Sequence, residues 1–214
     1  EFPAPIIFAL MLNEIRNNAF KRIAQTITYI PHFISLIVVC GLVADFTKTD
    51  GVVNQIISLL GGEKTNLLMR KDMFRTVYIA SGLWQNLGWN SIIYLSALSS
   101  IDNALYEASY IDGAGRWKQM IHITLPGIAP TIVILFILKL GGVLNVGFEK
   151  IILLYNPMTY ETADVISSYV YRKGLLEANY SYGTAVGLFN SIINFVLVIT
   201  ANRISKKVTN ISLW

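Results

Sequence analysis

Four long apolar segments constrain the fold of this chain more than any other feature of the sequence. They run over residues 23–43, 76–98, 128–146 and 184–201, with polar stretches between them. A helix needs about 20 predominantly apolar residues to cross the hydrocarbon core of a bilayer, and these segments meet or approach that length. The composition agrees, because 54% of the residues are hydrophobic and only 14% are charged, against about 25% charged in a typical soluble domain. The sequence predicts an all-α, polytopic helical membrane protein.

The segments between the spans predict smaller features. Residues 13–22 suit a short turn, and residues 52–60 are apolar enough for a short interfacial helix within the polar stretch 45–75. Pro31 interrupts the first span and predicts a kink there. The N-terminal apolar stretch, residues 5–12, is too short to cross a bilayer, and the chain starts with neither a methionine nor a basic signal-peptide region. We therefore expect the chain to be the C-terminal portion of a longer protein.

A polar stretch between the second and third spans carries two short helical patterns. Asp102 is a good N-cap for a helix over residues 103–112, and Gly113 can end it in the left-handed conformation. A second apolar face follows, and Pro126 marks the return to an apolar run. The residues of that second face are Ala114, Trp117 and Ile121. Two short amphipathic helices cannot bury their apolar faces on each other alone, so they are expected to dock in a groove of a partner.

The same stretch carries a family resemblance. Glu107-Ala108-Ser109, then Gly113, then Ile123-x-Leu125-Pro126 is similar to the EAA loop of binding-protein-dependent ABC importer permeases. Ser109 replaces the usual second alanine, a small-for-small change. The resemblance implies that residues of about 99–127 form a cytoplasmic coupling loop on an ATPase subunit, whereas without the motif Glu107 would be interpreted as a solvated helix residue. The implied coupling residues are Tyr106, Glu107, Ala108, Ser109, Asp112, Gly113, Ala114, Ile123, Leu125 and Pro126.

The resemblance extends over essentially the whole chain. Residues 106–130, 142–149, 154–157 and 163–166 resemble the LplB-like, MalF-related branch of carbohydrate permeases. This implies the type I ABC importer transmembrane fold, as a single domain over residues 1–214, multi-pass in a bacterial cytoplasmic membrane. In such permeases one or two spans precede this point, so the resemblance also implies that spans precede Glu1. The coupling loop and the C-terminus would be cytoplasmic, and residues 45–75 and 147–182 would face outward.

The resemblance also implies partners and a substrate. These are a second homologous permease, two ATPase subunits, an extracellular solute-binding protein, membrane lipid and a carbohydrate, taken to be an oligosaccharide. ATP and Mg would be bound by the ATPase subunits, and no cofactor by this chain. A permease for amino acids, peptides or phosphate would carry the same loop, and a passive channel or a membrane enzyme is a further alternative.

Enzymatic chemistry is not indicated by the sequence. His32 and His122 have no second ligand at metal-binding spacing, and no glycine-rich phosphate loop or nucleophile elbow occurs. We therefore expect neither a catalytic residue nor a metal site. The net charge of +4 comes without a dense basic run, which argues against nucleic acid as a partner. Cys40 is the only cysteine, which excludes a disulfide within the chain.

Polar side chains inside the spans are candidates for a translocation path. Asparagines four residues apart either join helices by hydrogen bonds or line the path, and a tryptophan either belongs to an interfacial belt or stacks on a sugar. Lys139 is expected near the bilayer centre, where an ammonium facing lipid costs about 2.5–3.5 kcal/mol, so it either pairs with an acid or lines the path. The candidates are Trp84, Asn86, Asn90, Lys139, Asn145, Asn190 and Asn194.

Overall fold

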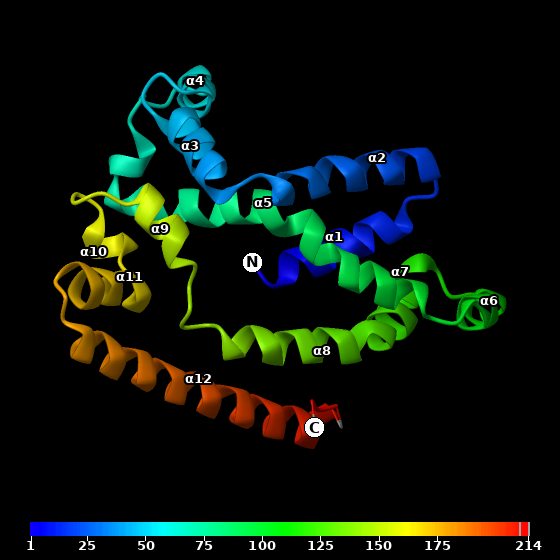
Figure 1. Ribbon diagram of the computed structural model, residues 1–214. Helices are drawn as coiled ribbons and strands as arrows, with labels where there is room; N and C mark the ends of the chain where they lie inside the picture. Colours follow the sequence, from blue (N-terminus) through cyan, green and yellow to red (C-terminus); the bar gives the residue numbers. More distant parts are fainter. Residues whose placement is uncertain (210, 214) are drawn as a thin grey trace. The chain divides into compact units, whose positions relative to one another are not determined.

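A computed structural model describes residues 1–209 and 211–213 of the chain. Every regular element in that part is helical (Figure 1), which confirms the predicted all-α class. The chain forms two compact units. The first comprises Glu1–Thr28, Leu87–Gly141 and Asn194–Trp214, and the second comprises Tyr29–Asn86 and Gly142–Ile193. Helices α5 (Lys71–Ser99) and α12 (Tyr180–Thr209) contribute residues to both units.

The first unit has a small core made by three helices. Ala9 of α1, Tyr94 and Leu98 of α5 and Ile128 of α8 are buried against one another. This core fixes the ends of α5 and α8 from which the predicted coupling loop extends. The elements of this unit are α1 (Pro3–Glu14), α2 (Asn18–Tyr29), α6 (Asn103–Ile111), α7 (Arg116–Gln119), the π-helical turn η3 (Met120–Thr124) and α8 (Leu125–Gly141).

The second unit has a core of its own, which includes Val39, Phe74 and Leu154 from α3, α5 and α9. The short helix predicted over residues 52–60 is confirmed as α4. The elements are the 3-10 turns η1 (Ile30–Phe33) and η2 (Leu67–Met69), the helices α3 (Leu36–Thr47), α4 (Val52–Leu59), α9 (Phe148–Leu154), α10 (Tyr160–Ala163) and α11 (Ile166–Val170), and the π-helical turn η4 (Tyr171–Leu176).

The loop between α3 and α4 is held by one buried side chain. Asn54 is fully buried, and its Nδ2 donates to the carbonyl oxygens of Thr47, Lys48 and Thr65 at 3.1, 2.8 and 2.7 Å. Its Oδ1 accepts the Thr65 N–H at 3.2 Å. A β-carbon on Gly51 would lie 2.3 Å from the carbonyl oxygen of Phe46, so the same loop requires glycine there.

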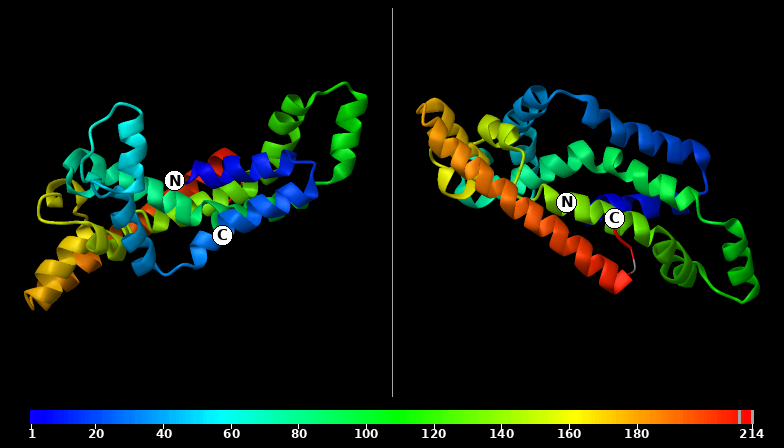
Figure 2. Two further views of the ribbon diagram at one scale, coloured as in Figure 1. Left: turned by 90° about the horizontal axis from the view of Figure 1, so that it is seen from above. Right: turned by 60° about the horizontal axis from the view of Figure 1, so that its bottom comes forward.

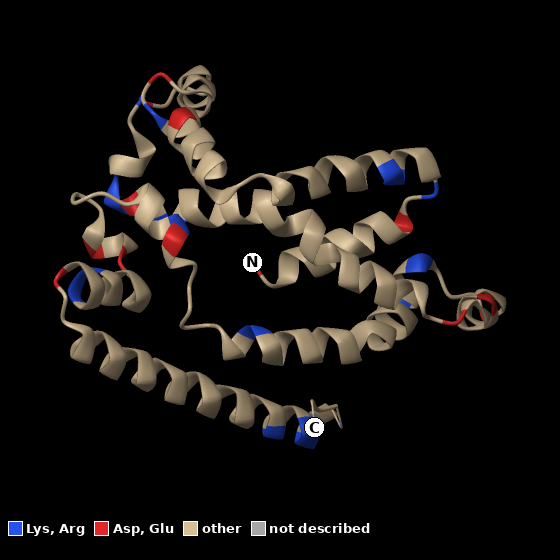
Figure 3. Ribbon diagram, viewed as in Figure 1, with Lys and Arg blue, Asp and Glu red and all other residues tan. Residues whose placement is uncertain are grey.

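Among the described residues, two helices are long and apolar enough to cross a membrane, namely Arg116–Gly141 with 26 residues and Tyr180–Lys207 with 28. Figure 3 shows α12 without charged residues until its C-terminal part, which contains Arg203, Lys206 and Lys207. Helix α5 has 29 residues but is not apolar enough for the same criterion, and it carries the amides of residues 85, 86 and 90. The expected span over residues 76–98 therefore stays a prediction.

The first expected span differs from the prediction. Instead of one kinked helix, Asn18–Phe33 and Leu36–Leu59 form a pair bent by 103°, which is either a broken span or a re-entrant loop. Pro31 lacks an N–H for a helical hydrogen bond, and α3 starts anew at Ser35, whose Oγ accepts the Val38 N–H at 3.4 Å. The proline and the new N-cap together convert the predicted kink into a break.

Three further boundaries also differ. The span predicted over residues 128–146 ends at Gly141, because the Gly141-Gly142 pair favours helix termination. The second short helix of the polar loop is not separate, since α7, η3 and α8 run on as one helix through Pro126. The predicted turn over residues 13–22 is shorter, because α2 already begins at Asn18.

Candidate functional site

The polar loop folds into a helical hairpin, and the two ends of its first helix, α6, were predicted correctly. We call residues 102–124 the α6–α7 hairpin; Figure 2 shows it extending away from α5 and α8. The Asp102 carboxylate accepts the Ala104 N–H at 2.9 Å and so caps α6. Gly113 has a φ of +74°, the left-handed conformation expected for a helix-ending glycine. Behind it, the Ala114 N–H donates to the Ser109 carbonyl oxygen at 2.9 Å.

The hairpin exposes large apolar side chains. Ile111 is 84% exposed and Trp117 is 71% exposed, and neither α6 nor α7 contains a buried residue. Glu107 and Ala108 are exposed as well. Contiguous exposed apolar surface rimmed by polar residues is typical of an interaction site. The other exposed apolar side chains of the hairpin are Leu105, Tyr110 and Ile121.

Some of the predicted coupling residues face the hairpin instead of solvent. The hydroxyl of Tyr106 lies 3.0 Å from the hydroxyl of Thr124, and the Nε2 of Gln119 donates to the Ser109 Oγ at 2.8 Å. Sequence reasoning missed Gln119 and Thr124. No local pattern signals them, because their partners lie 10 and 18 residues away.

The second unit contains a cavity of about 530 Å³ lined by two asparagines. The Nδ2 of Asn190, from α12, donates to the Oδ1 of Asn145 at 3.1 Å. Asn190 is only 8% exposed, and its own Oδ1 has no hydrogen-bond partner. Phe148 and Tyr171 provide aromatic walls, with ring centroids 6.2 Å apart. An unpaired buried acceptor is costly, by about 1–3 kcal/mol, so this cavity favours a ligand with hydroxyl donors.

A second cavity, of about 330 Å³, lies in the first unit and is lined by Trp89, Asn90 and Lys139 among others. Lys139 lies in the last turn of α8, two residues before the helix ends at Gly141. Lys139 thus lies near the end of its helix and not in the middle of it, and its depth in a bilayer stays a prediction. A cation in the last turn of a helix is favoured by the helix dipole, which explains how the sequence tolerates it.

The other candidates of the predicted path are in different surroundings. The Asn86 Oδ1 lies 3.1 Å from His32 Nδ1, and the Asn86 Nδ2 donates to the carbonyl oxygen of Gly82. Trp84 lines an apolar hollow of about 450 Å³ against α3 and α4. Asn194 is 8% exposed, and its Oδ1 has no hydrogen-bond partner. The structure thus brings together Asn145 with Asn190, and Asn90 with Lys139.

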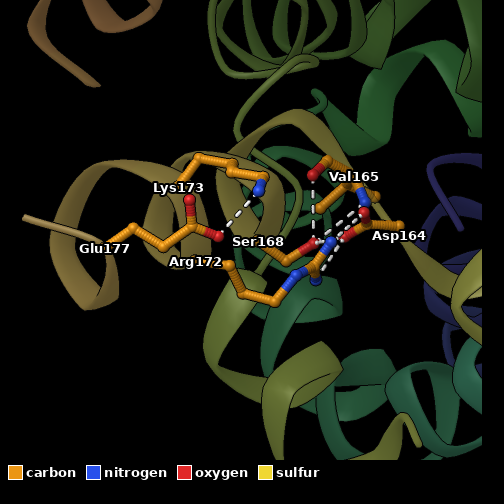
Figure 4. A network of polar contacts seen from close by, with 6 residues as sticks. All are labelled: Asp164, Val165, Ser168, Arg172, Lys173 and Glu177. Atoms are coloured by element: carbon orange, nitrogen blue, oxygen red, sulfur yellow. Dashed lines mark hydrogen bonds and ion pairs between the residues drawn. The ribbon is translucent and has the colours of Figure 1, made fainter. Parts of the chain in front are cut away.

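An ion pair orders the segment before α12, and sequence reasoning missed it (Figure 4). Arg172 donates to both carboxylate oxygens of Asp164 at 3.0 and 2.5 Å, and the Ser168 hydroxyl donates to the same carboxylate. The Arg172 guanidinium lies 4.7 Å from the Tyr160 ring centroid. Burial alone would raise the pKa of Asp164, but the hydrogen bonds from Arg172 and Ser168 outweigh it and lower that pKa. The spacing of 164, 168 and 172 is the sequence signal.

Within the described part of the chain, no three or more His, Cys, Asp or Glu side chains gather as metal ligands would. The protein is helical, with membrane-length apolar helices, an exposed apolar hairpin and two cavities that are lined in part by polar side chains. The chain belongs to the family described as "Binding-protein-dependent transport system inner membrane component", which matches residues 1–210. This confirms the resemblance drawn from the polar loop and places the chain among membrane transport components.

Similar proteins indicate which members of this transport family the chain resembles. The chain is 47% identical to the polygalacturonan/rhamnogalacturonan transport system permease protein YteP of Bacillus subtilis (strain 168), over 96% of this chain and 64% of that protein. It is 44% identical to protein LplB of the same strain, over 96% of this chain and 65% of that protein. The chain thus spans just under two thirds of the length of these relatives. A solved bacterial alginate ABC transporter, in complex with an alginate pentasaccharide-bound periplasmic protein, is similar with a TM-score of 0.96 and 48% identity, covering 99% of this chain and 74% of that one.

Proposed function

We propose that this chain is the transmembrane permease subunit of an ATP-driven importer that takes up an oligosaccharide. The observation that carries the proposal is the exposed apolar α6–α7 hairpin in a chain of this transport family. Relatives named for polygalacturonan, rhamnogalacturonan and alginate support a carbohydrate substrate. Their substrates are acidic polymers, and the cavity with Lys139, Asn90 and Trp89 offers an ammonium, an amide and an aromatic ring that suit an acidic sugar.

The partners follow from this role. Two ATPase subunits bind ATP and Mg, a second homologous permease completes the translocation path, and an extracellular solute-binding protein delivers the sugar. The hairpin and the C-terminus face the cytoplasm, with the hairpin docked by Ile111 and Trp117 in a groove of an ATPase subunit. This chain performs no bond chemistry, and it binds no cofactor.

The mechanism is transmission of motion. When ATP binding closes the ATPase dimer, the groove moves and the hairpin moves with it. Helix α8 continues directly from the hairpin through η3, so the displacement reaches the membrane helices and alternates access to the path. Within the path, the Asn190 Oδ1 and the aromatic walls of the larger cavity contact sugar hydroxyls and ring faces in turn.

The proposal is tested with the complete importer, reconstituted in liposomes from the full-length permease and its partners. Uptake of a labelled oligosaccharide should require ATP, the binding protein and an active ATPase. Asn190→Leu should lower uptake about tenfold, since it removes the unpaired acceptor and the donor to Asn145. Gly187→Leu should also block uptake, because a β-carbon at Gly187, which lines the same cavity, meets nothing within 4 Å and a leucine side chain has room to fill the cavity.

The matched control is Thr184→Val, on the same helix, whose hydroxyl donates only within the helix to the Tyr180 carbonyl oxygen. It does not line the cavity, so uptake should persist. Uptake that continues with a hydrolysis-dead ATPase would identify a passive channel and refute the proposal. Uptake of amino acids, peptides or phosphate in place of sugars would refute the carbohydrate assignment.

A further inference from the structure

The two helices of the α6–α7 hairpin are joined by two short side-chain contacts, besides a longer one at 3.5 Å from the Gln119 Nε2 to the Tyr106 carbonyl oxygen. The first is the Gln119 Nε2 donating to the Ser109 Oγ at 2.8 Å, and the second is the 3.0 Å contact between the hydroxyls of Tyr106 and Thr124. We call these four residues the clasp. The Ser109 hydroxyl itself donates to the Tyr106 carbonyl oxygen at 2.8 Å, so the two contacts are connected through α6.

The π-helical turn η3 makes the clasp possible. Residues five apart in an α-helix point about 140° away from each other around the axis. In a π-helical turn, where residue i pairs with residue i+5, they lie on nearly the same side. The Thr124 hydroxyl donates to the Gln119 carbonyl oxygen at 3.4 Å, five residues back. The wide turn therefore directs both Gln119 and Thr124 toward α6.

Little else holds α6 at a fixed angle. None of its residues is buried, and none belongs to the core around Ala9 and Ile128. The link to α7 contains Gly113 and Gly115, and glycine restricts the backbone least. Thr124, in contrast, is only 5% exposed and belongs to the helix that continues into α8. The clasp thus connects the exposed docking helix to a side chain anchored in the bundle.

We infer that the clasp fixes the angle of α6 against the α7–α8 helix, so that Gln119 and Thr124 are positioning residues for energy coupling. The inference rests on the proposed function. When an ATPase groove displaces α6, the two hydrogen bonds make α8 move with it, whereas a hinge at Gly113 would absorb the displacement. Ser109 is then more than a small replacement for alanine, because its hydroxyl oxygen accepts a hydrogen bond from the Gln119 side-chain amide.

The test measures uptake per ATP hydrolysed in the reconstituted full-length importer. Gln119→Leu and Ser109→Ala each remove the same hydrogen bond, and each should lower this ratio about fivefold, the equilibrium factor of one typical hydrogen bond. The double variant should be less affected than the product of the two single effects, since the bond that both variants remove can be lost only once. Co-purification with the ATPase subunits should persist, because Ile111 and Trp117 are unchanged.

Ser99→Ala is the matched control. Its hydroxyl also donates within its own helix, to the Leu95 carbonyl oxygen at 2.9 Å, but it makes no contact across the hairpin. It should keep the wild-type ratio. An unchanged ratio in both single variants, a multiplied effect in the double variant, or a loss of co-purification parallel to the loss of uptake would overturn the inference. A wild-type importer without ATP-dependent uptake would overturn the proposed function itself.

Discussion

Replacing Gly113 should impair coupling through backbone conformation alone. Its φ of +74° is left-handed, and a β-carbon built on it would meet nothing within 4 Å. A side chain is therefore opposed by the conformation and not by a neighbour. This separates two explanations of the helix-ending glycine that the sequence leaves open, a special backbone angle and a close contact.

The left-handed conformation costs a residue with a β-carbon about 1–2 kcal/mol, which lowers the population of the native hairpin about five- to thirtyfold. Asparagine adopts it more readily than alanine does, and a β-branched residue tolerates it least. Binding-protein-stimulated ATP hydrolysis and uptake should therefore both fall in the order Gly113→Asn, Gly113→Ala, Gly113→Val, with the last the most severe.

The order is decisive because asparagine is larger than alanine. If the defect grows with side-chain volume, so that Gly113→Ala is the mildest variant, then Gly113 is required for a contact with the partner and the conformational argument is refuted. Gly115→Ser is the control. Gly115 has a φ of −72° and precedes α7 as its N-cap, a position that serine favours, so this variant should couple normally.

Two predictions concern the segments between the expected spans. Asn54→Ala should lower the free energy of unfolding by about 3 kcal/mol, because the carbonyl oxygens of Thr47, Lys48 and Thr65 lose their donor. Thermal unfolding of the purified permease measures this effect. An unchanged midpoint would contradict the prediction. Asp164→Asn should cost about 1.5–3 kcal/mol at neutral pH. Since the folded pKa of Asp164 is lowered, its contribution is complete above the unfolded pKa of about 3.9 and is lost as the pH falls through the folded value. The difference in Tm from wild type should then stay constant from pH 7 to pH 5 and shrink only in stronger acid; a difference that shrinks already near pH 6 would exclude Asp164 as its source.

The ends of α6 were predictable because their causes are local. A capping carboxylate at Asp102 and a left-handed glycine at Gly113 act on the amides and dihedral angles next to them. Helix ends inside apolar runs were less predictable. Apolarity continues through Val143 and Val146, and only the Gly141-Gly142 pair signalled that α8 stops. The sequence therefore placed Lys139 well inside a helix, whereas it lies two residues before the helix end.

The contacts that assemble the sites could not be predicted in the same way. The clasp depends on η3, because in an ordinary α-helix Gln119 and Thr124 would point in different directions. The pair Asn145 and Asn190 joins residues 45 positions apart, from α12 and from the segment after α8. A sequence pattern names the polar residues of each helix, but which of them meet depends on how the helices pack.

Packing also gives different surroundings to Asn190 and Asn194 of α12, although the sequence pattern does not distinguish them. Both Asn190 and Asn194 are 8% exposed with an unpaired Oδ1, and a buried acceptor without a donor is costly in apolar surroundings. Asn190 borders the larger cavity and already donates to Asn145, so a small rotation of its amide would present the unpaired acceptor to a ligand hydroxyl. Asn194 does not border that cavity. Its Oδ1 therefore cannot accept a hydrogen bond from a ligand there and needs a donor from a neighbouring helix. In our proposal, Asn190 therefore contacts the sugar, and Asn194 joins helices within the assembled importer.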